Sequence, residues 1–174
     1  MILVIGATGF VGMYTVDKLL SDGKKVVATG RNKKLGEKLQ QMGAAFIPLD
    51  IADSSEFDAL PSDGIEGIAL LAGLLPANAT ADLDSEDNAA DYFEVNVIGL
   101  INVLEWARKH GIRKVISTCS YSDVSGAWGK GYPITEEEPR DFKFTGDHAV
   151  YVISKNAAND VMEYYNQQHG MQCS

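Results

Sequence analysis

Three glycines near the N-terminus restrict the fold of this chain more than any other feature. The stretch "VIGATGFVG" places Gly6, Gly9 and Gly12 directly after a short apolar run, residues 1–5, where a helical pattern begins. Gly6 permits a tight turn, Gly12 permits close packing of the helix on a sheet, and Gly9 leaves room for a pyrophosphate at the helix N-terminus. A turn that only needs flexible residues is the competing interpretation. The position between strand and helix favours a dinucleotide-binding loop.

Apolar runs and helical patterns alternate along the rest of the chain. Short β-branched runs predict strands, and apolar residues at helical spacing predict helices. Strands that alternate with helices indicate a doubly wound parallel sheet (a Rossmann fold) with helices on both faces, in one α/β domain. The predicted strands are residues 1–5, 25–29, 45–49, 67–72 and 113–118, with a sixth after Gly170; the predicted helices are residues 10–20, 33–42, 54–60, 87–110 and 148–169, and residues 122–146 are predicted to form a loop.

Charge and composition exclude several function classes. The net charge of -9 argues against a nucleic-acid partner, which would need a basic face. Residues 50–94 contain many acids and no Lys or Arg, and their spacing favours a solvated surface over a metal site. The sequence has no signal-peptide pattern and no apolar run of membrane-spanning length, and Cys119 and Cys173 fit neither a metal pattern nor a disulfide framework. We therefore expect a cytoplasmic protein with reduced cysteines that neither binds a metal nor associates with a membrane.

A tyrosine and a lysine four residues apart, in "YVISK", form the candidate catalytic pair. Tyr151 and Lys155 share one face of the predicted last helix. A free tyrosine has a pKa of about 10, and a nearby ammonium lowers it towards the range of a useful acid or base. The same spacing occurs often by chance on solvated helices. A glycine loop earlier in the chain and a strand ending in hydroxyl side chains favour an active site.

These motifs together resemble the extended branch of the short-chain dehydrogenase/reductase superfamily, the NAD(P)-dependent epimerase/dehydratase family. The glycine spacing, the "YVISK" pair, the stretch "FEVNVIGLINVLEWARKHGIRKVISTCS" and the acidic "PITEEEP" all resemble family motifs, over nearly the whole chain. The resemblance implies an oxidoreductase, epimerase or dehydratase that acts largely on nucleotide sugars. The sequence does not separate these three reactions.

The resemblance also implies roles for single residues. Tyr151 would be the acid/base, Lys155 would hold the nicotinamide ribose, and Ser120 would be the catalytic hydroxyl, although Thr118 and Ser122 remain possible. Asn96 would either support a proton relay or have a structural role. The implied cofactor-binding residues are Gly6, Thr8, Gly9, Phe10, Val11, Gly12, Arg31, Asp50, Ile51, Ala72, Tyr151 and Lys155.

The second predicted strand bears on the choice of cofactor. An acid usually ends this strand and binds the adenosine ribose, but Gly30 stands there and Arg31 follows. A guanidinium can bind a 2′-phosphate, which favours NADP over NAD. A basic surface turn without a role in cofactor choice is the alternative. Asp50 and Ile51 would line the adenine pocket, and Asp50 can also cap the next helix.

Two further expectations concern the whole chain. In the resembled family the chain continues into a C-terminal substrate domain, whereas this sequence ends at "MQCS". We therefore expect residues 1–174 to form a Rossmann domain that turns over nucleotide sugars poorly. We also expect its sheet to have a truncated edge. A non-catalytic NADP-binding sensor or partner-binding module, or a truncated inactive fragment, is the alternative to an enzyme. The resemblance implies a homodimer through the two long helices, and Leu100, Leu104, Val161, Met162 and Tyr165 support it as apolar residues beyond what one sheet face needs.

Overall fold

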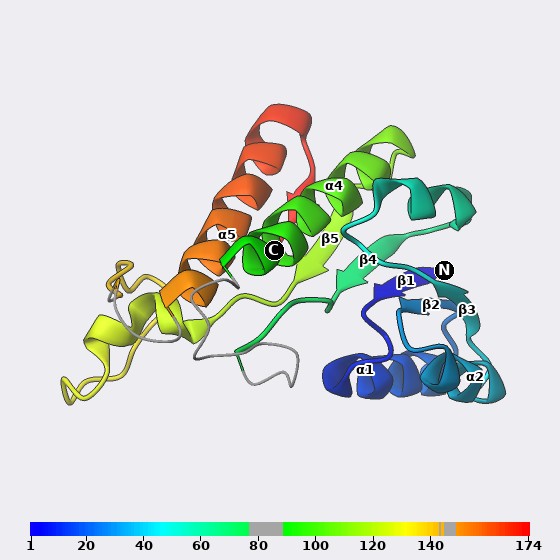
Figure 1. Ribbon diagram of the computed structural model, residues 1–174, viewed down its shortest axis with the longest axis horizontal. Coiled ribbons are helices and arrows are strands. Elements are labelled where there is room, and N and C mark those ends of the chain that lie inside the picture. The colour runs from blue at the N-terminus through cyan, green and yellow to red at the C-terminus, as the bar shows by residue number, and fades with distance from the viewer. Residues whose placement is uncertain (77–88, 143, 145–148) are drawn as a thin grey trace.

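A computed structural model describes residues 1–76, 89–142, 144 and 149–174 of the chain. Its centre is a six-stranded parallel sheet with the strand order β3-β2-β1-β4-β5-β6 (Figure 1). This order is the one expected of a doubly wound Rossmann fold, so the predicted fold class is confirmed. The strands are β1 (Ile2–Ile5), β2 (Val26–Gly30), β3 (Ala45–Pro48), β4 (Gly67–Leu70), β5 (Lys114–Ser117) and β6 (Gln172–Cys173).

Helices cover both faces of the sheet (Figure 1). Two pack on one face, around a core that includes Val4, Val16 and Leu39. On the opposite face, the larger core includes residues of the segments Ser54–Ala59, Gly99–Lys109 and Ala149–His169. The helices are α1 (Phe10–Ser21), α2 (Lys33–Gln41), the 3-10 helix η1 (Ser54–Ala59), α3 (Ala89–Phe93), the π-helix η3 (Glu94–Ile98), α4 (Gly99–Lys109), the 3-10 helix η4 (Tyr121–Ala127) and α5 (Ala149–His169).

The observed elements correct the sequence predictions in two places. Residues 122–146 were predicted as a loop, but η4 occupies the start of that stretch, because Ser120 caps it by accepting a hydrogen bond from the Ser122 N–H. The sheet was expected to have a truncated edge, and β6 has only two residues, but it still pairs with β5 in parallel register, with Lys114 opposite Gln172. Residues 87, 88 and 148, at the predicted starts of two helices, lie outside the described ranges.

The long predicted helix is interrupted by a turn of π-helix. It begins as α3, passes through η3 and continues as α4. Periodicity over the whole predicted helix does not reveal this change, because the π-helix is a single short turn inside an otherwise α-helical pattern. Gly99 follows the π-turn, and a Cβ there would lie 2.7 Å from the Ile51 side chain, so this glycine lets the helix approach the end of the third strand.

Hydrogen bonds fasten α4 to α5 side by side. The Tyr165 hydroxyl donates to the Glu105 carboxylate at 2.6 Å, and Arg108 forms an ion pair with the same carboxylate at 2.8 Å. These bonds lower the pKa of Glu105 to about 2, and burial raises the pKa of Tyr165.

Most of the apolar residues that supported the dimer prediction belong to the core of this chain. Leu100, Leu104, Met162 and Tyr165 are all buried, and Val161 is partly buried against the same core. The interpretation that these side chains are in excess of what the sheet needs is therefore wrong for the four buried residues.

One edge of the sheet is formed by β3. Its residues Ala45 and Pro48 are exposed. The strand is short and ends in a proline, which has no N–H to donate, and these two features limit pairing with another strand.

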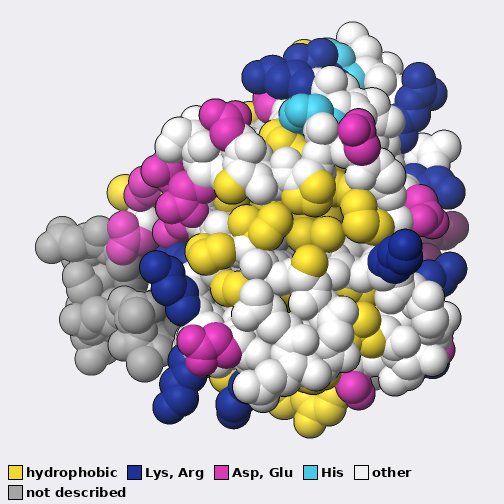
Figure 2. Space-filling view, turned by 90° about the vertical axis from the view of Figure 1, so that its right-hand side faces the viewer, with side chains coloured by type: hydrophobic (Ala, Val, Ile, Leu, Met, Phe, Trp, Pro, Cys, Tyr) yellow, Lys and Arg dark blue, Asp and Glu magenta, His cyan; other side chains and the backbone are white. Residues whose placement is uncertain are grey.

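Figure 2 shows the side of the molecule at the right of Figure 1, where hydrophobic side chains gather in the middle and charged side chains lie around them. Within the ranges that the structure describes, none of the helices has the length and apolar character that a membrane crossing requires.

Candidate functional site

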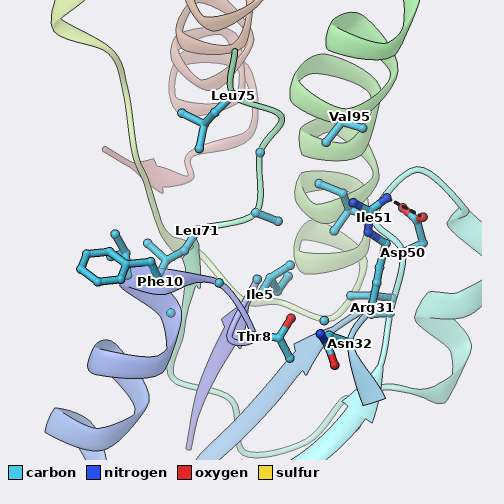
Figure 3. A pocket seen from close by; sticks show the side chains of 18 residues that line it. Ile5, Thr8, Phe10, Arg31, Asn32, Asp50, Ile51, Leu71, Leu75 and Val95 are labelled. Carbon is cyan, nitrogen blue, oxygen red and sulfur yellow. Dashed lines mark ion pairs between the residues drawn. The ribbon is translucent and has the colours of Figure 1, made fainter. Parts of the chain in front are cut away.

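A cleft of about 510 Å³ opens at the carboxyl ends of the central strands. Its walls come from the glycine loop after β1, the ends of β2 and β3, and the segment after β4, with Val95 of η3 on the far side (Figure 3). In open α/β sheets the carboxyl edge is where ligands bind. The predicted cofactor-binding residues that line this cleft are Gly6, Thr8, Gly9, Phe10, Val11, Gly12, Arg31, Asp50, Ile51 and Ala72.

The three glycines of the loop have different reasons to be glycine. Gly6 has a φ of +85°, and a Cβ there would lie 2.4 Å from the Ala72 nitrogen. A Cβ at Gly12 would lie 2.2 Å from the Gly6 carbonyl oxygen. A Cβ at Gly9, by contrast, would meet only that carbonyl oxygen, at 3.3 Å. Internal packing therefore requires Gly6 and Gly12, whereas Gly9 mainly keeps the cleft open.

The glycine loop also leads into a helix start that is open to a ligand. Gly9 is the N-cap of the 12-residue α1, and no side chain caps its free N–H groups. The loop is held by backbone hydrogen bonds, from Ala7 N–H to the Thr29 carbonyl at 2.8 Å and from Gly9 N–H to the Gly6 carbonyl at 3.0 Å. A helix N-terminus of this kind attracts an anion.

The other end of the cleft carries an ion pair. An Nη of Arg31 lies 3.6 Å from a carboxylate oxygen of Asp50, and Figure 3 shows the two side chains pointing toward each other. Asp50 also accepts a hydrogen bond from the Ala52 N–H at 3.1 Å. The predicted capping role of Asp50 falls to Asp53, whose side chain accepts from the Ser55 N–H at the start of η1.

Several residues of the cleft wall were not predicted from the sequence. Asn32 lines the cleft and caps α2, with its side chain accepting from the Leu35 N–H at 3.1 Å. An Asn directly before a helical pattern is a recognisable cap signal, so it could have been found. Leu71, Gly73, Leu75 and Val95 have no such signal, because their place in the wall depends on how the β4 segment packs against η3.

Asn96 ties the segment after β4 to α5. Its side-chain oxygen accepts from the Leu74 N–H at 2.8 Å, and its amide donates to the Leu74 carbonyl at 3.1 Å and to the Ser154 hydroxyl at 3.0 Å. Ser154 in turn donates to the Tyr151 carbonyl at 2.7 Å. Of the two roles that the sequence left open for Asn96, these bonds support the structural one.

Tyr151 and Lys155 lie close to the cleft but not in its lining. The Tyr151 side chain is 8% exposed and packs edge-on against Tyr92, with ring centroids 6.1 Å apart, in a cluster that includes Leu74. Lys155 is buried, and its ammonium donates to the Thr118 carbonyl at the end of β5. Burial lowers the pKa of Lys155, and the nearby Cys119 opposes this effect.

Ser120 lies at the same end of β5, two residues after the carbonyl that Lys155 contacts. Its side chain is buried and accepts a hydrogen bond from the Ser122 N–H at 3.3 Å. Thr118 is exposed, and Ser122 is half-buried. In the part of the chain that the structure describes, no hydrogen bond joins the side chains of Tyr151, Lys155 and Ser120, so their joint role remains a prediction.

Several known proteins are similar to this chain in sequence and in fold. A UDP-glucose 4-epimerase from Mycolicibacterium smegmatis is 31% identical over 99% of this chain and 53% of its own length. The crystal structure of a UDP-glucose 4-epimerase from Thermotoga maritima with UDP-glucose matches with a TM-score of 0.79 at 25% identity, over 99% of this chain and 53% of that one. A Thermus thermophilus UDP-glucose 4-epimerase in complex with NAD also matches with a TM-score of 0.79 at 25% identity, over 99% of this chain and 52% of the other.

The family of this chain follows from a match over almost its whole length. The chain spans about half the length of the relatives that it matches. The sequence model of one family matches residues 2–174, which include the glycine loop, the cleft and the Tyr151 helix. The chain therefore belongs to the NAD dependent epimerase/dehydratase family.

Proposed function

We propose that this chain binds a nicotinamide dinucleotide in the cleft and carries the acid/base residues for oxidation and reduction at a carbinol carbon of a nucleotide sugar. The observation that carries the proposal is the open cleft around Gly9, at the uncapped N-terminus of α1. The names of the relatives support the substrate class, since those proteins are UDP-glucose 4-epimerases.

The cleft fits a dinucleotide on its own geometry. A Cβ at Gly9 would reach into space that the chain leaves free, apart from its contact with the Gly6 oxygen. The N–H groups at the start of α1 supply donors for a pyrophosphate, and the apolar side chains of Leu49, Ile51 and Val95 supply surface for a planar base. When bound, the nicotinamide would exchange a hydride with the substrate carbon.

The residues of this chain would handle the proton. Tyr151 is the proposed acid/base for the substrate hydroxyl, because the ammonium of Lys155 one helical turn away stabilises a phenolate. Lys155 is held beside the end of β5 by the Thr118 carbonyl. Ser120 is the proposed hydrogen-bond donor to the substrate oxygen, which would favour the carbonyl form.

We also propose that NADP(H) binds more tightly than NAD(H), and three features support this preference. No carboxylate ends β2, and a Cβ at Gly30 would lie 2.3 Å from the Thr8 hydroxyl, so an acid does not fit there without displacing Thr8. The guanidinium of Arg31 lies in the cleft wall instead. Lys33 and Lys34 follow in the first turn of α2.

The test separates binding from turnover. The purified chain is titrated with NADPH and NADH by fluorescence. Turnover of a UDP-hexose is followed in two ways: the absorbance of reduced nicotinamide reports net oxidation, and chromatographic separation of the UDP-hexose epimers reports epimerisation, which leaves the cofactor unchanged. Tyr151→Phe should keep cofactor affinity within about twofold and lower turnover by about 100-fold or more, because a positioned acid/base contributes a factor of this size. Tyr164→Phe, at an exposed position of the same helix, is the matched control and should retain both.

A second candidate function is a dinucleotide-binding module without turnover. It is favoured by the packing of Tyr151 against Tyr92 and by the absence of Tyr151 and Lys155 from the cleft lining. Tight cofactor binding with no turnover above the Tyr151→Phe background would establish this module. Failure to bind either dinucleotide would contradict both candidates.

A further inference from the structure

We infer that Asp50 determines cofactor specificity: its carboxylate competes with a 2′-phosphate for the guanidinium of Arg31 and so restrains the preference for NADP(H). The inference rests on the proposed function of the cleft and concerns how that site discriminates between its two cofactors. Arg31 directly follows β2, and Asp50 lies two residues after β3, so both stand at the same end of the cleft. Figure 3 shows the guanidinium turned to the carboxylate.

Asp50 is the fixed partner of this pair, and Arg31 is the movable one. The backbone N–H of Asp50 donates to the Glu56 carboxylate at 2.6 Å, and its side chain accepts from the Ala52 N–H at 3.1 Å, so the turn after β3 holds it at both ends. The Arg31 side chain is 69% exposed, and Asp50 is the only ion-pair partner that it has within the described ranges. Long exposed side chains reorient at little cost.

The charges around the Arg31–Asp50 pair also oppose the binding of a 2′-phosphate. Glu56 contacts the Asp50 backbone, and Asp53 caps the helix that follows, so this turn is acidic at the end of the cleft where Arg31 stands. A 2′-phosphate that recruits Arg31 must break the existing ion pair and remain close to a carboxylate. A cofactor with a free 2′-hydroxyl needs neither change. The pair therefore weakens the binding of NADP(H) selectively.

Removal of the Asp50 charge should shift the balance of affinity towards NADPH. Asp50→Asn retains an oxygen for the Ala52 N–H and frees the guanidinium. We expect the ratio of NADPH affinity to NADH affinity to rise about fivefold, the size of effect that an exposed ion pair produces. Both affinities are measured by fluorescence titration at low salt, where surface electrostatics are strongest.

Two further variants isolate the mechanism. Asp58→Asn removes the same charge from an exposed position of η1 outside the cleft, and it should leave the ratio of the two affinities unchanged. In an Arg31→Ala background, Asp50→Asn should no longer improve NADPH binding, because the competition needs the guanidinium. An unchanged NADPH-to-NADH ratio in Asp50→Asn, or a gain that persists without Arg31, would overturn the inference and leave the proposed function standing. If the wild-type chain binds neither dinucleotide, both are wrong.

Discussion

Single residues in the glycine loop fall into two groups, which the sequence pattern does not separate. Gly6 and Gly12 lie against backbone atoms of their own chain, at distances that no Cβ can occupy. Gly9 has ordinary extended angles, φ -82° and ψ 173°, and faces the cleft. The loop thus combines two glycines that internal packing requires with one glycine that mainly keeps the cleft open.

Substitutions should separate these two requirements. Gly9→Ala should lower NADPH affinity by about tenfold or more, and it should destabilise the fold by only about 1 kcal/mol, the difference between glycine and alanine as an N-cap. Gly6→Ala should cost about 2 kcal/mol or more, because a positive φ and a clash with Ala72 combine. Thermal denaturation without ligand and fluorescence titration measure the two effects. Equal loss of stability in both variants would show that Gly9 is also structural.

At the scale of elements, the π-turn in the long helix organises the cleft wall. It places Asn96 where its side chain satisfies both backbone groups of Leu74, and it brings Val95 to the cleft. Leu74 packs against the cluster of Tyr92, Tyr151 and Val152, and its neighbours Gly73 and Leu75 line the cleft. The Asn96 side chain therefore ties a segment of the cleft wall to α5.

Loss of the Asn96 side chain should be costly. Asn96→Ala leaves the N–H and the carbonyl of Leu74 without their partners, and we expect the free energy of unfolding to fall by about 2–4 kcal/mol. Asn102→Ala is the control on the same helix; its side chain donates to the Ile51 carbonyl at 2.9 Å, and its loss should cost about 1 kcal/mol. Urea denaturation compares the two variants. A cost for Asn96→Ala no larger than the control would contradict this role.

The residues that line the cleft could be predicted from the sequence better than the surroundings of Tyr151. The residues near the glycine loop lie a few positions from strand ends, so the topology of a parallel sheet brings them together without further information. Residues 128–142, between Ser120 and Tyr151 in the chain, form no helix or strand, and Tyr151 lies in a cluster with Tyr92 and Leu74. No local sequence pattern predicts the path of that segment or the members of the cluster. The π-turn, the Asn96 bonds and the Arg31–Asp50 pair likewise depend on contacts between distant segments.

At the scale of the whole molecule, the exposed surfaces of α4 and α5 limit how two copies of the chain could pair. The family resemblance implies pairing through α4 and α5, but most of the apolar residues first expected to mediate it are buried in this chain. Ile98, just before α4, and Tyr164 on α5 remain exposed, at 48% and 54%. Partly buried Ile101 and Val161 lie one helical turn from them. A dimer through these helices must therefore use this narrower apolar stripe.

We expect a homodimer, with a mass near twice the 18.8 kDa of one chain, by light scattering at micromolar concentration. Ile98→Lys should convert it to a monomer, because a charge in the centre of an apolar interface loses its hydration without gaining a partner. Ile116→Lys is the matched control. Ile116 is 62% exposed on β5, next to the buried Val115, so its side chain points to the opposite face of the sheet. The control should remain a dimer. A monomeric wild-type chain would contradict the prediction, and a dimer that Ile116→Lys alone disrupts would place the interface on the opposite face of the sheet from α4 and α5.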